Sequence, residues 1–307
     1  MADYSRQSFL GADSEQLLSD SVVGLVGYSG GGSHYGQQFG HIGVGHFVVI
    51  DPKKIVATHR PRFVGSEPLD VEDGWLKVDI AERQIKRGNP LAEVKKFALT
   101  WQEATDALLK CDIIFGAVDS YKERDELERF CRRNMIPYID IGMDVRLIGD
   151  DEYSISGQVI QSLPGGHCMR CCQFITDDKL AREAEDYGAA GPAPQVIWSN
   201  GVLASTAVGW GVALFCPWRK EKRLFRWLAY DGDTGELKTP AMVPKYLNQT
   251  ICSHHPVTEL GDPICDIRQH IIAGEPTQVG TSAFSQVRSK RSVIRSRLLS
   301  VWTRMFS

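Results

Sequence analysis

Short apolar blocks alternate with charged and polar stretches along the first half of the chain. The runs at residues 22–26, 47–50 and 111–118 are bounded by glycine or acidic residues. Such runs predict parallel strands that are buried on both faces of a sheet. Between the runs, apolar residues at helical spacing and densely charged segments predict helices. These helices are expected over residues 78–88, 103–110 and 125–133.

The second half of the chain carries a different pattern. Residues 154–161 alternate between polar and apolar side chains, which predicts an antiparallel strand. A hairpin is predicted around residues 231–233, and helices are predicted over residues 179–185 and 195–213. Together the two halves predict an α/β fold, with a Rossmann-like mixed, mainly parallel sheet flanked by helices and a β-rich C-terminal half.

Composition places the chain among ordinary globular proteins. Of its 307 residues, 43% are hydrophobic and 24% are charged, and the net charge of -3 gives no reason to expect nucleic acid as the main partner. No apolar run is long enough to span a membrane, and residues 1–10 lack the apolar core of a signal peptide. Eight cysteines are too few for a disulfide scaffold at this length, so we expect reduced thiols and a cytoplasmic protein.

A change in composition near residue 276 predicts a domain over residues 1–275 and a tail over residues 276–307. Residues 279–306 contain six lysines and arginines and no acidic residue, with apolar side chains on one helical face. A basic amphipathic helix is typical of segments that bind a partner groove or an anionic surface. A helix docked on its own domain or on a second subunit would show the same pattern.

The first predicted strand ends in a cluster of glycines. These glycines permit a sharp turn and a close approach of backbone N–H groups to a ligand, and the N-terminus of the following helix favours negative charge. The second strand ends at Asp51, where an acid in a βαβ fold can accept hydrogen bonds from ribose hydroxyls. A structural glycine turn without a ligand is the alternative. The predicted nucleotide site comprises Gly27, Ser29, Gly30, Gly31, Gly32 and Asp51.

Basic residues follow the strand-end acid. Arg62 belongs to a short basic run, and Lys77 opens the next predicted helix. Arginine suits bidentate phosphate contacts. A basic surface loop would explain the charge near Arg62 but not its placement, and spacing does not separate a phosphate-binding Lys77 from a solvated one. Asp119 follows the strand at residues 111–118, at a position where a carboxylate beside nucleotide phosphates commonly holds Mg2+.

Cysteines and histidines form two widely separated half-sites for a metal ion. Cys168 and Cys171 are spaced C-x-x-C, and Cys252 is followed closely by His254 and His255. Zinc takes four Cys and His ligands tetrahedrally, so we predict a structural zinc site with either histidine as the fourth ligand. A redox pair is less favoured because the C-x-x-C follows a loop and does not open a helix in a redox fold. A chance spacing is the remaining alternative.

These features in combination resemble the ThiF/MoeB/HesA superfamily, the bacterial relatives of ubiquitin-activating enzymes. The resemblance covers the chain from about Tyr4 to about His255. Within the superfamily the sequence is most similar to bacterial proteins found beside ubiquitin-like modifiers and conjugating enzymes in anti-phage operons. The motifs that carry it are Tyr4-Ser5-Arg6-Gln7, the glycine turn, Asp51, Arg62, Lys77, Asp119-Ser120 and the two zinc half-sites.

The resemblance implies an adenylyltransferase that uses Mg-ATP to activate the C-terminal carboxylate of a ubiquitin-like protein. The glycine turn would cradle the phosphates and Asp51 would hold the ribose, while Arg62 and Lys77 would neutralise phosphate charge. Asp119 would carry Mg2+. Arg6 would act as an arginine finger in the site of the other subunit, which requires a homodimer. Thioester formation and transfer to a conjugating enzyme follow adenylation in part of the superfamily.

Three departures from the family pattern affect these implications. His59 stands where the family usually has asparagine, and Ser29 replaces the middle glycine. Members that form a thioester carry their cysteine in a crossover loop, and residues 187–194 contain none. Cys172 is the nearest spare thiol and is therefore the candidate nucleophile. A reactive cysteine needs exposure and a lowered pKa, which the sequence does not show.

Two other classes of protein remain as alternatives. An NAD-dependent oxidoreductase shares the glycine turn and the strand-end acid, but it does not need Arg62, Lys77 and Asp119 around a triphosphate. A non-catalytic subunit related to activating enzymes would be expected to lack phosphate ligands, whereas this chain keeps nearly all of them. The sequence therefore favours adenylation over both alternatives.

Overall fold

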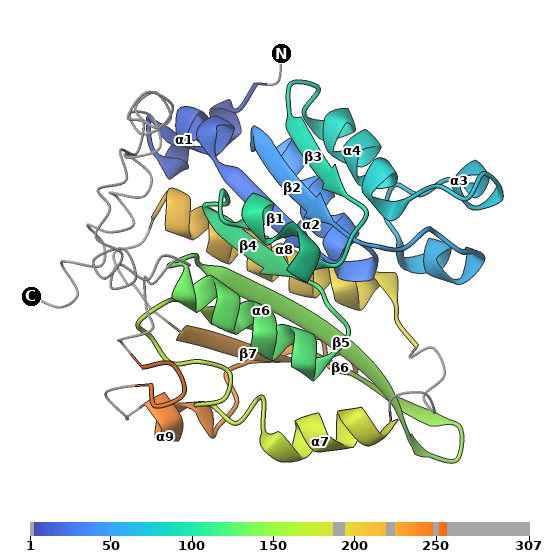
Figure 1. Ribbon diagram of the computed structural model, residues 1–307, viewed down its shortest axis with the longest axis vertical. Helices are drawn as coiled ribbons and strands as arrows, with labels where there is room; N and C mark the ends of the chain where they lie inside the picture. The colour runs from blue at the N-terminus through green and yellow to red at the C-terminus, as the bar shows by residue number, and fades with distance from the viewer. Residues whose placement is uncertain (1–2, 187–193, 219–224, 248–251, 257–307) are drawn as a thin grey trace, which may run out of the picture.

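The strands form one eight-stranded sheet in the computed structural model, which describes residues 3–186, 194–218, 225–247 and 252–256 (Figure 1). The strand order is β3-β2-β1-β4-β5-β6-β7-β8. Four pairings, from β3 to β5, are parallel and the three from β5 to β8 are antiparallel. The predicted mixed, mainly parallel sheet is confirmed. The strands are β1 (Val22–Val26), β2 (His46–Ile50), β3 (Glu93–Phe97), β4 (Ile113–Gly116), β5 (Tyr138–Gly149), β6 (Glu152–Ser162), β7 (Phe225–Asp231) and β8 (Glu236–Lys238).

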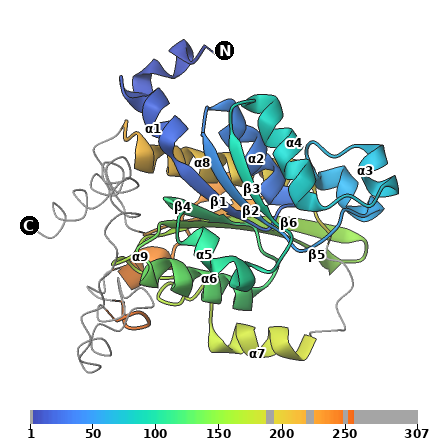
Figure 2. The same cartoon turned by 45° about the horizontal axis from the view of Figure 1, so that its top comes forward.

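Helices cover both faces of this sheet, as Figure 2 shows. Apolar residues of α1, α2, α4 and α8 pack on one face, and those of α5, α6 and α9 pack on the other. The helices are α1 (Ser14–Asp20), α2 (Gly30–His41), α3 (Pro68–Glu72), α4 (Lys77–Gly88), α5 (Thr105–Leu108), α6 (Tyr121–Arg133), α7 (Asp177–Asp186), α8 (Ile197–Phe215) and α9 (Val243–Leu247). Three 3-10 helices are η1 (Ser5–Leu10), η2 (Ala57–Arg62) and η3 (Trp101–Ala104).

The alternation of side chains along β1 divides the core into two layers. Val23 and Leu25 pack with α2, α4 and α8, whereas Val22 and Val26 pack with α5 and α6. Successive side chains of a strand point to opposite faces, so a strand covered by helices on both sides reads as a continuous apolar run. All five residues of β1 are buried, so its sequence shows no alternation of apolar and polar residues.

The two largest differences from the predicted helices are at residues 103–110 and at the start of α6. The helix expected over residues 103–110 is divided into η3 and the short α5, which ends at Leu108. Helix α6 begins four residues before the predicted start, because the Ser120 hydroxyl caps it by accepting the N–H of Glu123 at 3.0 Å. The predicted tail over residues 276–307 lies outside the described residues. Within the part of the chain that the structure describes, no helix is long and apolar enough to cross a membrane.

The order of the strands indicates which edge of the sheet is suited to bind a ligand. From β1 the chain adds β2 and β3 on one side, then returns to add β4 on the other side of β1. In open α/β sheets, ligands bind at the carboxyl ends of the strands where the order reverses in this way. The segments that follow β1, β2 and β4 carry the glycine turn, Asp51 and Asp119. The fold therefore brings these three predicted elements to one edge.

Candidate active site

The glycine turn follows β1 and starts α2. Gly27 has a φ of +84°, and a Cβ atom there would lie 2.6 Å from the carbonyl oxygen of Ala117. A Cβ atom on Gly32 would lie 2.1 Å from the carbonyl oxygen of Gly27. Glycine is therefore required at both positions, the first for its backbone conformation and the second for space. Ser29 is the N-cap residue of α2, and its hydroxyl has no hydrogen-bond partner among the described residues. This arrangement leaves a polar group and the α2 N-terminus for an anion such as phosphate.

Asp51 links the glycine turn to the basic residues. Its carboxylate accepts the N–H of Tyr28 at 2.8 Å and that of Lys53 at 2.9 Å, and Lys77 Nζ lies 3.8 Å away. Burial raises the pKa of Asp51, and the positive charge of Lys77 opposes this shift. A carboxylate offers about four acceptor sites, so one that already accepts two N–H groups can still accept a ribose hydroxyl. The N–H of Tyr28 in the glycine turn thus orients Asp51, the residue that is expected to bind the ribose.

Basic side chains gather beside Asp51. The pKa of Lys77, at the start of α4, is lowered mainly by burial and further by Lys53 and Arg62, while Asp51 and Asp119 oppose the shift. Burial and the charges of Lys77, Arg62 and Lys53 lower the pKa of His59 to about 4. At neutral pH His59 is therefore an uncharged hydrogen-bonding group among cations. Its Nδ1 accepts the N–H of Val56 at 3.3 Å, which leaves Nε2–H as the donor.

Lys53 is the site residue that the sequence interpretation missed. It lies two residues after Asp51, and its charge acts on both His59 and Lys77. In the sequence, Lys53 lies close to the strand-end acid Asp51, but Lys54 lies nearly as close and carries the same charge. Only the folded chain separates them, since Lys54 approaches Gly74.

Asp119 follows β4 and is exposed at the same edge. The charge of its carboxylate acts on His59, Lys77, Glu123 and Arg124. The backbone before it is held by Arg124, whose Nη2 donates to the carbonyl of Val118 at 2.6 Å. An accessible carboxylate beside several cations is suited to hold a magnesium ion shared with phosphate oxygens. Asp119 therefore fits the magnesium role that its position in the sequence indicated.

Arg6 lies apart from these residues. It belongs to η1. The ring of the nearby Tyr4 lies against Gly43, since a Cβ atom added to Gly43 would lie 3.0 Å from this ring. Gly43 precedes β2, so this contact is at the amino edge of the sheet, opposite the edge that carries Asp51 and Asp119. Arg6 is exposed. The structure therefore does not bring Arg6 into the site of its own chain.

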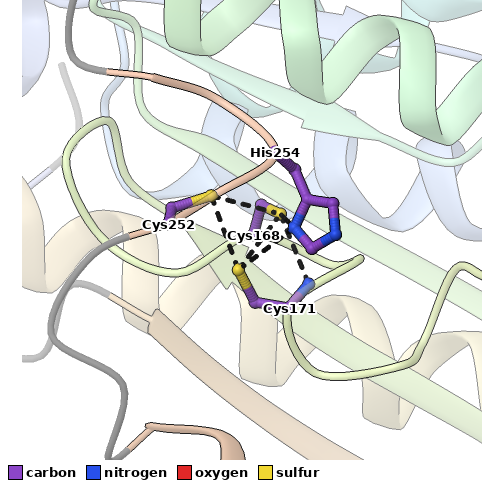
Figure 3. Close-up of side chains that lie close together, drawn as sticks. All are labelled: Cys168, Cys171, Cys252 and His254. Atoms are coloured by element: carbon purple, nitrogen blue, oxygen red, sulfur yellow. Dashed lines mark hydrogen bonds between the residues drawn. The ribbon is translucent and has the colours of Figure 1, made fainter.

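The two zinc half-sites meet in space, as Figure 3 shows. The sulfur atoms of Cys168, Cys171 and Cys252 lie 3.4 to 3.6 Å from one another. His254 Nδ1 lies 3.6 Å from the sulfur of Cys168 and 3.4 Å from that of Cys171. Tetrahedral zinc with bonds of about 2.0 to 2.3 Å separates its ligand atoms by about 3.5 to 3.8 Å. The four side chains thus fit a zinc ion.

His255, the other candidate fourth ligand, occupies a different position. It is buried close to Glu128 and Cys168, and neither ring nitrogen has a hydrogen-bond partner. The distances therefore favour His254 as the fourth ligand.

Helix α6 holds the loop that carries the C-x-x-C. Both carboxylate oxygens of Glu128 accept the N–H of Met169, at 3.0 and 3.2 Å. Arg132 donates to three backbone carbonyls of the preceding loop, at 2.6 to 3.2 Å. Arg170 forms a two-point ion pair with Asp125, at 2.7 and 2.9 Å. Because these contacts come from one rigid helix, the cysteine pair is positioned independently of any metal ion.

We expect the protein to contain about one zinc ion per chain and to lose thermal stability when a strong chelator removes it. Replacing Cys252 with serine should abolish zinc binding, and His254→Ala should weaken it more than His255→Ala. Cys131→Ala is the control, because Cys131 is buried away from the cluster and its loss should leave the zinc content unchanged. Elemental analysis of protein purified under reducing conditions checks the prediction, and less than about half a zinc ion per chain would contradict it.

Cys172 does not have the surroundings of a nucleophile. Its side chain is fully buried in the apolar layer around α6, and burial is the main cause that raises the pKa of its thiol to about 12. A reactive cysteine requires an accessible thiolate. The sequence selected Cys172 because it is adjacent to the zinc pair, but this adjacency is also the reason for its burial. The structure corrects that assignment.

We expect Cys172→Ala to retain ATP–pyrophosphate exchange within about two-fold, with a loss of stability of roughly 1 kcal/mol from the small cavity created. Any thiol-sensitive adduct with a carrier protein should persist in the variant. Mass spectrometry after incubation with Mg-ATP and carrier checks this. Loss of an adduct seen with the unmodified protein, while exchange continues, would restore Cys172 as the nucleophile.

A comparison with models of protein families shows to which family the chain belongs. The model of the ThiF family matches residues 4–250. The chain belongs to the ThiF family. All of the predicted nucleotide residues lie within the matched region, whereas the second zinc half-site at Cys252 lies just beyond it.

Curated relatives are 23 to 28% identical to this chain over the aligned residues. The tRNA threonylcarbamoyladenosine dehydratase of Escherichia coli is 26% identical over 41% of this chain and 48% of its own length. The sulfur carrier protein ThiS adenylyltransferase of Escherichia coli is 23% identical over 62% and 73%. The SAMP-activating enzyme E1 of Haloferax volcanii is 28% identical over 51% and 54%. The chain thus spans about half the length of two of these three relatives.

Solved structures show the same fold. The crystal structure of Escherichia coli MccB with ATP matches with a TM-score of 0.64 at 20% identity, over 81% of this chain and 73% of that chain. The structure titled PaaA matches with a TM-score of 0.59 at 18% identity, over 76% and 80%. At these identities the likeness concerns the fold alone. It confirms the Rossmann-like architecture of the ThiF family for this chain.

Proposed function

We propose that this ThiF-family protein adenylates the C-terminal carboxylate of a small ubiquitin-like or sulfur-carrier protein, at the expense of ATP. The observation that carries the proposal is the meeting of the glycine turn, the Asp51–Lys77 pair and Asp119 at the carboxyl edge where the strand order reverses. One relative is named as the adenylyltransferase of the sulfur carrier protein ThiS and another as a SAMP-activating enzyme E1, which supports this substrate class.

The reaction requires an electrophilic phosphorus and a positioned carboxylate. A carboxylate oxygen forms a bond to the α-phosphorus, the bond from that phosphorus to the bridging oxygen breaks, and pyrophosphate leaves with the bridging oxygen. Catalysis of this kind consists mainly of positioning and charge neutralisation. Asp119 would hold the magnesium ion, which would supply positive charge to the phosphates.

The residues of the chain would divide these tasks. The α2 N-terminus and the Ser29 hydroxyl would hold phosphate oxygens, and Asp51 would accept hydrogen bonds from the ribose. Lys53, Arg62 and Lys77 would neutralise the triphosphate. His59 would donate Nε2–H without adding charge, which is the task of an asparagine amide at that position.

A second subunit would complete the site. Arg6 lies in η1, whose N-cap residue Tyr4 contacts Gly43 at the amino edge of the sheet, and Phe9 of the same helix is 67% exposed. The ring of Phe9 packs edge-on against Trp218 at 6.1 Å, and Trp218 is 43% exposed. Exposed aromatic rings next to an exposed arginine are typical of a surface that a partner covers. We therefore propose a homodimer in which Arg6 reaches the site of the partner.

The cluster of cations also separates this proposal from the oxidoreductase alternative. A nicotinamide dinucleotide has two linked phosphates, for which a glycine turn and one helix N-terminus suffice in Rossmann proteins. This site adds Lys53, Arg62 and Lys77 together with an exposed carboxylate. Such an excess of positive charge with one metal-binding group suits a triphosphate bound with Mg2+.

The proposal is tested by ATP–pyrophosphate exchange with a purified carrier protein that ends in Gly-Gly, taken from a gene beside this one. We expect exchange that depends on ATP, Mg2+ and the free C-terminal carboxylate. A carrier that ends in a carboxamide is the control and should give none. Oxidation of NADH by the protein, with no exchange, would replace adenylation with the oxidoreductase alternative. Transfer to a conjugating enzyme is then tested with the neighbouring gene product.

A further inference from the structure

A carboxylate distant in sequence occupies the start of α6, directly after Asp119. The first three backbone N–H groups of this helix belong to Tyr121, Lys122 and Glu123. The hydroxyl of Ser120 accepts the third. The first two are accepted by Glu183 of α7, whose Oε1 lies 2.7 Å from the N–H of Tyr121 and whose Oε2 lies 2.9 Å from that of Lys122.

Unoccupied N–H groups at this place would compete for Asp119. A helix N-terminus has free donors and a positive partial charge, and it attracts the nearest carboxylate. Asp119 lies two residues before Tyr121, directly before the Ser120 cap, and aspartate readily bonds to backbone N–H groups a few residues ahead of it. An Asp119 held in this way would be turned away from a metal ion shared with phosphates.

We propose that Glu183 is a positioning residue for the adenylation site, because it occupies the α6 N-terminus and so leaves Asp119 free to hold Mg2+. This inference rests on the role proposed above for Asp119.

Contacts on both sides of Asp119 support this inference. Before it, Arg124 holds the carbonyl of Val118 at 2.6 Å. After it, Glu183 holds two consecutive N–H groups. The backbone around the carboxylate is thus held from both directions, while the carboxylate itself is exposed. Such fixed surroundings orient a metal ligand, and their loss typically lowers metal affinity by about 10 to 100-fold.

The docking of α7 keeps Glu183 in place. Lys179 of α7 has its Nζ 5.2 Å from the centre of the Tyr121 ring, and it donates to the carbonyl of Phe174 at 2.6 Å. The rings of Tyr121 and Phe174 also contact each other, with centroids 5.7 Å apart. Helix α7 is therefore attached to the first residue of α6 by stacking as well as by the carboxylate of Glu183.

The test is the magnesium dependence of ATP binding to the full chain, measured by calorimetry. Glu183→Gln keeps the size of the side chain but leaves only one oxygen to accept the two N–H groups. We expect it to raise the Mg2+ concentration for half-maximal ATP binding by about 10-fold, with ATP binding in the absence of Mg2+ unchanged. Glu185→Gln, an exposed change on the same helix, is the matched control and should change neither quantity.

A double-mutant cycle with Asp119→Asn separates positioning from general destabilisation. If Glu183 acts through Asp119, Glu183→Gln should have no further effect on the magnesium dependence once Asp119 is replaced. An effect of equal size in both backgrounds, or no effect of Glu183→Gln alone, overturns the inference while the role of Asp119 stands. A magnesium dependence unchanged by Asp119→Asn overturns the proposed role of Asp119 itself. Glu183→Asp, which keeps the charge but is one methylene shorter, serves if the glutamine variant does not fold.

Discussion

Replacing Asp119 with alanine is expected to lower ATP–pyrophosphate exchange by at least about 100-fold while the fold stays intact. The carboxylate is exposed at the carboxyl edge of the sheet, and its charge acts on Lys77 and His59. Its loss removes the group proposed to hold Mg2+ where charge is transferred to pyrophosphate, and such electrostatic groups typically contribute about 100 to 1000-fold to the rate. Because the side chain is exposed, its removal should cost less than about 0.5 kcal/mol of stability.

Exchange is measured with Mg-ATP and the carrier protein, and thermal unfolding verifies the fold. Asp106→Ala is the matched control, since Asp106 is an exposed acid on α5, away from the site residues. It should retain normal exchange. An Asp119→Ala protein that is folded and exchanges at a near-normal rate would show that another group holds the metal.

Mixing an Arg6→Ala chain with an Asp119→Ala chain is expected to restore adenylation that neither homodimer has. In the proposed homodimer, Arg6 acts in the site of the partner. A mixed dimer then has one site that lacks both groups and one site with both intact. The intact site combines Asp119 of one chain with Arg6 of the other. Each heterodimer should therefore have roughly half the activity of the unmodified dimer.

The position of Arg6 in the structure makes this a test of mechanism as well as of assembly. Tyr4, the N-cap residue of η1, lies at the amino edge of the sheet, opposite the edge that carries Asp51 and Asp119. Arg133→Ala, at an exposed arginine at the end of α6, is the control and should remain active by itself. Native mass spectrometry must confirm exchange of subunits. Confirmed heterodimers without recovered activity would refute the action of Arg6 across the interface.

Much of the candidate nucleotide site was predictable because its signals are local. Position 27 requires glycine because of its backbone conformation, and position 32 requires glycine because of a close contact. Both requirements are therefore visible in the sequence as glycine residues. Asp51 and Asp119 each follow an apolar run, and parallel strands end at the same edge of a sheet. Residues far apart in the chain could therefore be assigned to one site without knowledge of their contacts.

The class of fold and the mixed sheet were predictable from the sequence, as were the candidate nucleotide edge and the meeting of the two cysteine–histidine half-sites, because periodicity, glycine positions and ligand spacing are properties of short segments. The tertiary structure distinguishes between nearby candidate residues. It buries Cys172, brings His254 rather than His255 to the three sulfur atoms, and takes Arg6 away from its own site.

The cap on α6 is the clearest case of this division. Ser120 caps the helix, which begins four residues before the start predicted from the sequence, and Glu183, sixty-two residues away from Tyr121, completes the cap. Nothing in the composition of α7 distinguishes Glu183 from Glu185. Burial, hydrogen bonding and the choice between neighbouring identical residues depend on contacts between distant segments, and such contacts exist only once the chain has folded.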